Sequence, residues 1–309
     1  MKKELMILPI VASVFFASCS QDVPVIVEGP TKTIPLPTST TMVYLSGRGG
    51  LGWQVFLTHN YLESFRLTGG LFDTQADWSP DKKWIVFVRG LPGGAFQVWK
   101  MRYDGEGKQA LTPVDRDCEG PHFSPDGRKI AFNFLTGARY DIFVMDSDGK
   151  NWEQLSDSVR IPFWKNATFA MFDWSPDGQS IVFTFYRFDA DRPRSSVGIL
   201  NLGTGEFRHV EKLDPVEPYQ LRWSPVSNEF VFVGSGARIY RSNTDGTAIV
   251  ELAGLYSYEP DWSFDGKEIA YTHLDSLAGF RTVWTMARDG TNKIQRIALP
   301  DHHNSAPVW

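Results

Sequence analysis

The sequence predicts an all-β fold, a six-bladed β-propeller built from four-stranded antiparallel blades. Three observations predict it: a turn phrase that recurs along the chain, alternating apolar pairs that follow each copy, and Asp-Gly hairpin signals later in each unit. The complete copy of the phrase is Trp174-Ser175-Pro176-Asp177-Gly178. In such a turn Pro presets φ, Ser and Asp accept local backbone hydrogen bonds, and Gly takes a positive φ at the exit.

An aromatic residue opens each copy of the phrase, and we call these residues the anchors. The anchors are Trp78, Phe123, Trp174, Trp223, Trp262 and Trp309. They are 39 to 51 residues apart, and a four-stranded propeller blade repeats every 40 to 50 residues or so. The repeat therefore predicts one blade for each anchor.

Each unit also carries the signals of three further strands. Alternating apolar pairs mark the second strand: Ile85 and Phe87, Ile130 and Phe132, Ile181 and Phe183, Phe230 and Phe232, Ile269 and Tyr271. Third strands run through Trp99, Phe143, Ile199, Ile239 and Trp284 to turns at Gly105, Gly149, Gly205, Gly246 and Gly290. Fourth strands run through Leu111, Leu155, Val210, Leu252 and Ile297. Period-two alternation and Asp-Gly turns are the signature of antiparallel hairpins.

Residues 1–19 have the layout of a secretory signal. A positive start at Lys2 and Lys3 precedes an apolar run, and small residues precede Cys19. The tetrad Phe16-Ala17-Ser18-Cys19 resembles a bacterial lipobox, with Phe in place of the usual Leu. The resemblance implies that Cys19 is lipidated, and Ser20 implies sorting to an outer membrane of the bacterial cell envelope. An ordinary signal peptide is the alternative.

Residues 20–40 form a predicted linker, because their prolines are scattered among Val, Thr and Ser without a usable period. Residues 41–309 form the predicted propeller. Its first unit starts with a second strand at Met42 and Tyr44 and lacks a first strand. The missing strand is expected at Ser305–Trp309, so that one blade is assembled from two distant parts of the chain and closes the ring.

The composition excludes several classes of function. The chain has 31 Lys+Arg against 36 Asp+Glu, a formal net charge of −5, so no nucleic-acid partner is expected. With Cys19 lipidated, Cys118 has no partner for a disulfide. No complete metal-ligand spacing is present, so neither a metal nor a cofactor is expected.

The order Trp-Ser-Pro-Asp-Gly, Ile-x-Phe, Asp-Gly resembles the propeller repeats of the TolB type, often described as tryptophan–aspartate-like. The resemblance covers residues 41–309. It implies the fold, and it says little about function because such repeats occur in scaffolds, peptidases and lyases. TolB proteins carry an additional N-terminal domain for which residues 20–40 are too short, so a Tol–Pal role is not implied.

The repeated turns should occupy one face of the disc, and the loops of variable length the other, which we call the variable face. Ligand-binding residues concentrate on variable loops over a rigid scaffold. The candidate binding residues on this face are Trp164, Lys165, Arg187, Asp189, Arg192, Arg194, His273 and His302. Solvated loops whose aromatics only cover the blades are the alternative.

The residues that precede the anchors should line the central channel. They are Asp77, His122, Asp173, Arg222 and Asp261. They could bind a small ligand or ion, although polar side chains at such positions more often bond the backbone of neighbouring blades.

These patterns favour a non-catalytic, lipid-anchored binding scaffold of the cell envelope, with a protein or glycan as its ligand. A monomer or a subunit of a hetero-complex is expected. The alternatives are a polysaccharide lyase of the oligouronide type, acting at the variable face, and a structural subunit of a multiprotein envelope complex. No Gly-x-Ser-x-Gly nucleophile motif is present, and no catalytic residue is predicted.

Overall fold

The protein is described from a computed structural model. The structure describes residues 34–47, 52–59, 61, 63–70, 72–137, 139–155, 169–187, 193–297 and 303–309. All of them belong to one compact unit, Thr33–Trp309. Within these residues no helix is long and apolar enough to cross a membrane.

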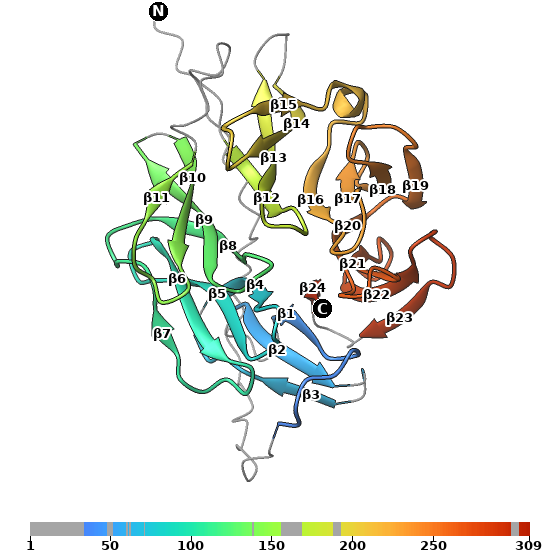
Figure 1. Ribbon diagram of the computed structural model, residues 1–309. Coiled ribbons are helices and arrows are strands. Elements are labelled where there is room, and N and C mark those ends of the chain that lie inside the picture. Colours follow the sequence, from blue (N-terminus) through green and yellow to red (C-terminus); the bar gives the residue numbers. More distant parts are fainter. Residues whose placement is uncertain are drawn as a thin grey trace, which may run out of the picture. The chain divides into compact units, whose positions relative to one another are not determined.

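The described chain forms six antiparallel sheets of four strands each, arranged as a ring (Figure 1). We number the sheets one to six around this ring. The first sheet contains β24 (Asn304–Val308), β1 (Met42–Ser46), β2 (Gln54–His59) and β3 (Glu63–Arg66). The second contains β4 (Asp73–Trp78), β5 (Trp84–Gly90), β6 (Phe96–Arg102) and β7 (Gln109–Ala110). The third contains β8 (Cys118–Phe123), β9 (Lys129–Thr136), β10 (Arg139–Asp146) and β11 (Glu153–Gln154).

The remaining three sheets follow in chain order. The fourth contains β12 (Phe169–Trp174), β13 (Ser180–Arg187), β14 (Arg194–Asn201) and β15 (Phe207–His209). The fifth contains β16 (Tyr219–Trp223), β17 (Glu229–Gly234), β18 (Arg238–Asn243) and β19 (Val250–Ala253). The sixth contains β20 (Ser257–Trp262), β21 (Glu268–Leu274), β22 (Arg281–Ala287) and β23 (Ile294–Ile297). The six-bladed propeller predicted from the repeat is thus confirmed.

The first sheet is assembled from both ends of the described chain. Strand β24 pairs with β1, with Val43 opposite Val308, and Figure 1 shows the C-terminus beside β1. The predicted strand at Ser305–Trp309 is therefore confirmed. Pairing at this joint completes the first sheet and keeps β1 from being an exposed edge strand, which is how propellers close their ring.

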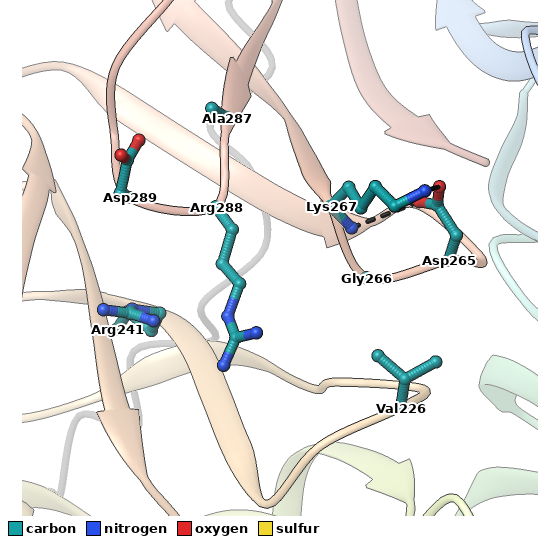
Figure 2. A pocket seen from close by; sticks show the side chains of 8 residues that line it. All are labelled: Val226, Arg241, Asp265, Gly266, Lys267, Ala287, Arg288 and Asp289. Carbon is teal, nitrogen blue, oxygen red and sulfur yellow. Dashed lines mark hydrogen bonds and ion pairs between the residues drawn. The ribbon is translucent and has the colours of Figure 1, made fainter.

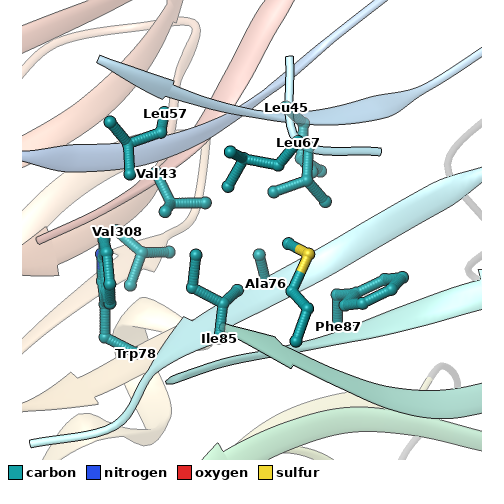
Figure 3. Packing of buried hydrophobic residues seen from close by; sticks show 11 residues of the cluster. Val43, Leu45, Leu57, Leu67, Ala76, Trp78, Ile85, Phe87 and Val308 are labelled. Atoms are coloured by element: carbon teal, nitrogen blue, oxygen red, sulfur yellow. The ribbon is translucent and has the colours of Figure 1, made fainter. Parts of the chain in front are cut away.

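The core lies between facing sheets. In the cluster drawn in Figure 3, Val43 and Leu57 of the first sheet face Ile85 of the second sheet, with the anchor Trp78 beside Val308. All of these side chains are at least 95% buried. Complete burial of one such aliphatic side chain stabilises a fold by roughly 1.5 to 3 kcal/mol, so the stability of the ring is distributed over its six interfaces.

The repeated turn has the predicted geometry. In the fourth sheet Ser175 Oγ donates to Asp177 Oδ1 at 2.6 Å. Gly178 follows with a φ of 68°, which glycine adopts without steric cost. Lys82 holds the same position in the second sheet with a φ of 53°. Because the 1→2 and 3→4 connections of an antiparallel sheet emerge at one end, all of these turns lie on one face, which we call the turn face.

Two details differ from the sequence-based expectations. The outermost strands β7, β11 and β15 end just before Leu111, Leu155 and Val210, which are nevertheless buried. A 3-10 helix, η3 (Glu211–Val216), inserts Leu213 between the fourth and fifth sheets. Its Pro215 and the absence of a helical apolar period concealed it in the sequence.

Candidate functional site

The innermost strand of every sheet contains a β-bulge, seen as a register shift between the residues one and four before the anchor in five sheets, and one residue earlier in the fourth sheet. The residue three before the anchor has a positive φ in five sheets, at Gln75, Gly120, Gln220, Glu259 and Ala306. A bulge leaves a backbone N–H without its ladder partner. Side chains of the preceding sheet accept several of these N–H groups.

Two layers of hydrogen bonds join neighbouring sheets around the centre. In the lower layer, which is nearer the turn face, the aspartate that directly precedes one anchor accepts the backbone N–H of the following anchor. Asp77 accepts from Phe123 at 3.0 Å, Asp173 from Trp223 at 2.8 Å, and Asp261 from Trp309 at 3.2 Å. In the upper layer Gln75 accepts from Gly120 at 2.7 Å, Gln220 from Glu259 at 3.0 Å, and Glu259 from Ala306 at 2.8 Å. These bonds join the second sheet to the third, the fourth to the fifth, the fifth to the sixth and the sixth to the first.

The five predicted channel residues form one polar cluster, which we call the channel cluster. His122 Nδ1 lies 3.5 Å from Asp77 Oδ2, and its Nε2 lies 2.7 Å from Arg222 Nη1. Arg222 Nε is 3.4 Å from Asp261 Oδ1. Since β8 and β16 belong to sheets that are not neighbours, Arg222 reaches past the fourth sheet to His122. The cluster thus connects the second, third, fifth and sixth sheets.

Burial dominates the protonation of this cluster. Desolvation raises the pKa of Asp261 to about 7, although Arg222 beside it acts in the opposite direction. The pKa of Asp173 is raised for the same reason. Among the described residues no group of three His, Cys, Asp or Glu side chains could hold a metal ion. The contacts of the cluster are those of an inter-blade connector, which was the structural alternative for these positions.

The structure places three of the predicted variable-face residues, Arg187, Arg194 and His273. Trp164, Lys165, Asp189, Arg192 and His302 lie outside the described residues, as does Cys19. Arg187 ends β13 opposite Arg194, which begins β14 and is exposed. His273 lies in β21, where its Nδ1 is 3.4 Å from Ser257 Oγ and its ring is 6.1 Å from that of Trp284.

The structure adds residues that the sequence reasoning missed. Arg281 lies over the ring of Tyr258 at 5.7 Å, and its Nη1 is 3.9 Å from Glu259 Oε1. Burial raises the pKa of Tyr219 to about 12, with Tyr258 and Tyr186 close enough to raise it further. Tyr140 donates to Glu119 Oε1 at 3.0 Å, and burial raises the pKa of Glu119.

These side chains share one end of the sheets. We call the set of Tyr140, Tyr186, Tyr219, Tyr258, Glu259 and Arg281 the mouth cluster. Its tyrosines come from four different sheets and lie at the variable-face end of β10, β13, β16 and β20. A weak signal was present, since Tyr219 and Tyr258 both stand four residues before an anchor.

Comparisons with curated proteins give partial matches. No family model matches the chain. An uncharacterized protein of Agrobacterium fabrum is 31% identical over 166 residues, which cover 50% of this chain and 53% of that protein. A Tol-Pal system protein TolB of Anaeromyxobacter dehalogenans is 36% identical over 92 residues, covering 28% of this chain and 20% of that protein. The chain therefore spans about half of the first relative and a fifth of the second.

Solved structures agree on the fold. TolB from Acinetobacter baumannii has a TM-score of 0.71 at 15% identity, covering 89% of this chain and 68% of that one. An oligogalacturonate lyase in complex with manganese has a TM-score of 0.54 at 15% identity, covering 82% and 71%. At such identities the likeness establishes the architecture alone. The chain is a TolB-like six-bladed β-propeller.

Proposed function

We propose that this propeller is a non-catalytic binding scaffold of the bacterial cell envelope whose variable face contacts a protein or glycan partner. The observation that carries the proposal is the mouth cluster, in which Tyr186, Tyr219 and Tyr258 of three sheets lie close enough to interact, with Arg281 and Glu259 beside Tyr258. Tyr and Arg are enriched at binding hot spots because they combine large contact area with directional hydrogen bonds.

A second feature of the variable face supports a protein partner. Leu277, in the loop between β21 and β22, is 98% exposed. Its side chain offers apolar contact area on the same face as the mouth cluster, and the centre of an interface is more apolar than the surrounding surface. The likeness to TolB, a Tol-Pal system protein by name, supports an envelope location and a protein partner.

Photo-crosslinking in cells tests this proposal. A benzophenone amino acid placed at Leu277 or Arg194 should yield adducts, whereas one at Lys83 on the turn face, also exposed, serves as the matched control. Mass spectrometry of the adducts distinguishes a protein from a glycan. Absence of adducts at both variable-face positions, in cells where the chain is folded, would contradict the proposal.

Membrane attachment through Cys19 is the second part of the proposal, supported by the lipobox-like tetrad Phe16-Ala17-Ser18-Cys19. Cys19→Ala should move the protein from the membrane fraction to the soluble fraction, because a single residue carries the acyl chains. Metabolic labelling with a fatty-acid analogue should mark the wild-type chain and leave Cys19→Ala unlabelled. Unchanged membrane attachment of the variant would refute the anchor.

A further inference from the structure

A hollow of about 380 Å³ lies on the turn face between the fifth and sixth sheets. Figure 2 shows that Arg241 of β18 and Arg288, which directly follows β22, extend toward the same space. We call it the arginine hollow. It is lined by Val226, Arg241, Asp265, Gly266, Lys267, Ala287, Arg288 and Asp289.

One carboxylate holds the two guanidinium groups together. Glu229 Oε1 accepts from Arg241 Nη1 at 2.8 Å, and its Oε2 lies 2.5 Å from Arg288 Nη2. Ser227 Oγ also donates to Glu229 Oε2, at 2.9 Å. Two positive charges thus share the single negative charge of Glu229, whose oxygens are engaged with three donors.

The other carboxylates of the hollow are engaged with their own turns. Asp265 accepts from Ser263 Oγ at 2.8 Å and pairs with Lys267 Nζ at 3.0 Å. Asp289 accepts the backbone N–H and the hydroxyl of Thr291 at 3.0 and 2.6 Å. Arg241 Nε is buried and has no hydrogen-bond partner among the described residues. Because this Nε is buried, a ligand in the hollow would be bound through the terminal N–H groups of the two guanidinium groups, which outnumber the two oxygens of Glu229.

The two turns that border the hollow are also the ones that depart from the repeat. Val226 stands where four other turns have Asp81, Asp126, Asp177 and Asp265, and it is 58% exposed. Phe264 stands where the other turns have proline, and it is 41% exposed. Exposed apolar groups beside unused donors are the composition of a binding surface, and local departures from a repeat tend to mark functional positions.

We propose that the arginine hollow binds one carboxylate group from an acidic segment of a protein partner. A planar carboxylate matches the parallel N–H groups of a guanidinium. Asp265 and Asp289 at the rim repel a second negative charge, so the hollow suits an isolated acid better than a polyphosphate or a nucleic acid. Val226 and Phe264 would contact an apolar residue beside that acid.

This inference is independent of the proposed variable-face function, since the hollow lies on the opposite face. Either surface can fail its test without affecting the other.

The test is a titration of the full-length, ¹⁵N-labelled protein, observed through the arginine Nε–Hε signals. The probe is an acetylated, amidated Val-Glu-Val tripeptide, and the neutral Val-Gln-Val tripeptide is its control. Arg241→Lys and Arg288→Lys assign the two signals by their disappearance. We expect saturable shifts of both signals with the acidic peptide and none with the neutral one.

Two variants and one control make the result specific. Arg288→Gln should weaken peptide binding about tenfold or more, because it removes a charged hydrogen-bond donor. Val226→Asp should have a similar effect by placing a competing carboxylate in the hollow, while restoring the residue that the other turns carry. Arg102→Gln removes an arginine that pairs with Asp104 on the surface, 2.8 Å away, and should change nothing.

Three outcomes would overturn the proposal. The first is the absence of shifts in either arginine signal at saturating peptide. The second is equal shifts with Val-Glu-Val and Val-Gln-Val, which would mean that the carboxylate is irrelevant. The third is tighter binding of inorganic phosphate than of the acidic peptide, which would reassign the hollow to a phosphate-bearing ligand.

Discussion

Two hollows on the turn face occupy related places and differ at one equivalent position. The arginine hollow lies between the fifth and sixth sheets. A second hollow, of about 540 Å³, lies between the third and fourth sheets, where Val144, Leu155, Trp174 and Leu202 line it together with the charged residues Asp126, Lys129, Glu153 and Asp177. Val144 pairs with Ala131 in the third sheet, and Arg241 pairs with Val231 in the fifth sheet. Ala131 and Val231 each stand eight residues after the anchor of their sheet, so Val144 and Arg241 occupy equivalent positions. One backbone position thus carries an apolar side chain in one interface and a cation in the other.

The comparison teaches that the repeat tolerates a cation at this position wherever its own sheet or the neighbouring sheet supplies an acceptor. In the second sheet the same position is Lys100, whose Nζ lies 2.5 Å from the carbonyl oxygen of Ser147. Burial lowers the pKa of Lys100. In the fifth sheet the acceptor is Glu229. No acceptor is needed in the third sheet, where Val144 is 3% exposed.

Val144→Arg should have the largest effect. It places a cation at a buried position without the carboxylate that Glu229 provides, so we expect a loss of about 3 kcal/mol in the free energy of unfolding. Urea unfolding measures it. The reciprocal variant Arg241→Val should cost less, because Arg288 still neutralises Glu229. Equal losses of stability in Val144→Arg and Arg241→Val would contradict the idea that the acceptor Glu229 distinguishes the two positions.

Glu229→Gln should have the next largest effect. It leaves Arg241 and Arg288 close together without a neutralising charge, and we expect a loss of about 2 kcal/mol. Lys129→Gln is the matched control, since Lys129 holds the same position in the third sheet and its pair with Asp146 is exposed. That control should stay within roughly 0.5 kcal/mol of the wild type.

The channel cluster also holds an arginine, Arg222, beside the buried carboxyl groups of Asp173 and Asp261. Because the folded-state pKa of Asp261 is raised from 3.8 to about 7, the folded protein binds more protons than the unfolded chain between those values. This group therefore lowers stability as the pH rises through that window. Asp261→Asn should have a Tm that falls less between pH 4 and pH 7, measured by calorimetry. Parallel profiles for the two proteins would contradict the raised pKa.

Val226→Asp should have the smallest effect on stability. It recreates the bond that joins Ser124 Oγ to Asp126 Oδ1 at 2.6 Å, with an expected gain of about 0.5 kcal/mol at neutral pH. The serine hydroxyl holds the pKa of Asp126 below its usual value. The stability that such a serine–aspartate hydrogen bond adds is present at pH values above the aspartate pKa in the unfolded chain. It is lost as the pH falls through the lower aspartate pKa of the folded protein. Tm values at pH 7 and pH 3 measure it, and an equal gain at both would exclude this mechanism.

Much of the fold could be predicted because short sequence patterns determine its strands and turns. The turn phrase, the Ile-x-Phe alternation and Asp-Gly each act within a few residues, and together they define four strands per anchor. Even the closure by Val308 followed from the missing first strand. The helix η3 escaped because its proline and its single buried leucine, Leu213, form no recognisable period.

The candidate sites were less predictable. Asp77, His122, Asp173, Arg222 and Asp261 could be located from their place before each anchor. That Arg222 reaches His122 across the ring depends on side-chain length and on the width of the centre, which no local pattern encodes. Arg281 was missed because it lies on a third strand and becomes notable only beside Tyr258 and Glu259 of an innermost strand.

The sequence by itself determined the strand count, the turn chemistry and the order of the blades, because hydrogen bonding and apolar alternation act over short distances along the chain. Only the tertiary structure decided which charges meet. Glu229 receives Arg241 from its own sheet and Arg288 from the next, and the mouth cluster draws its tyrosines from four sheets. Such groups are brought together by the curvature of the ring and the packing between sheets, and both depend on the whole chain.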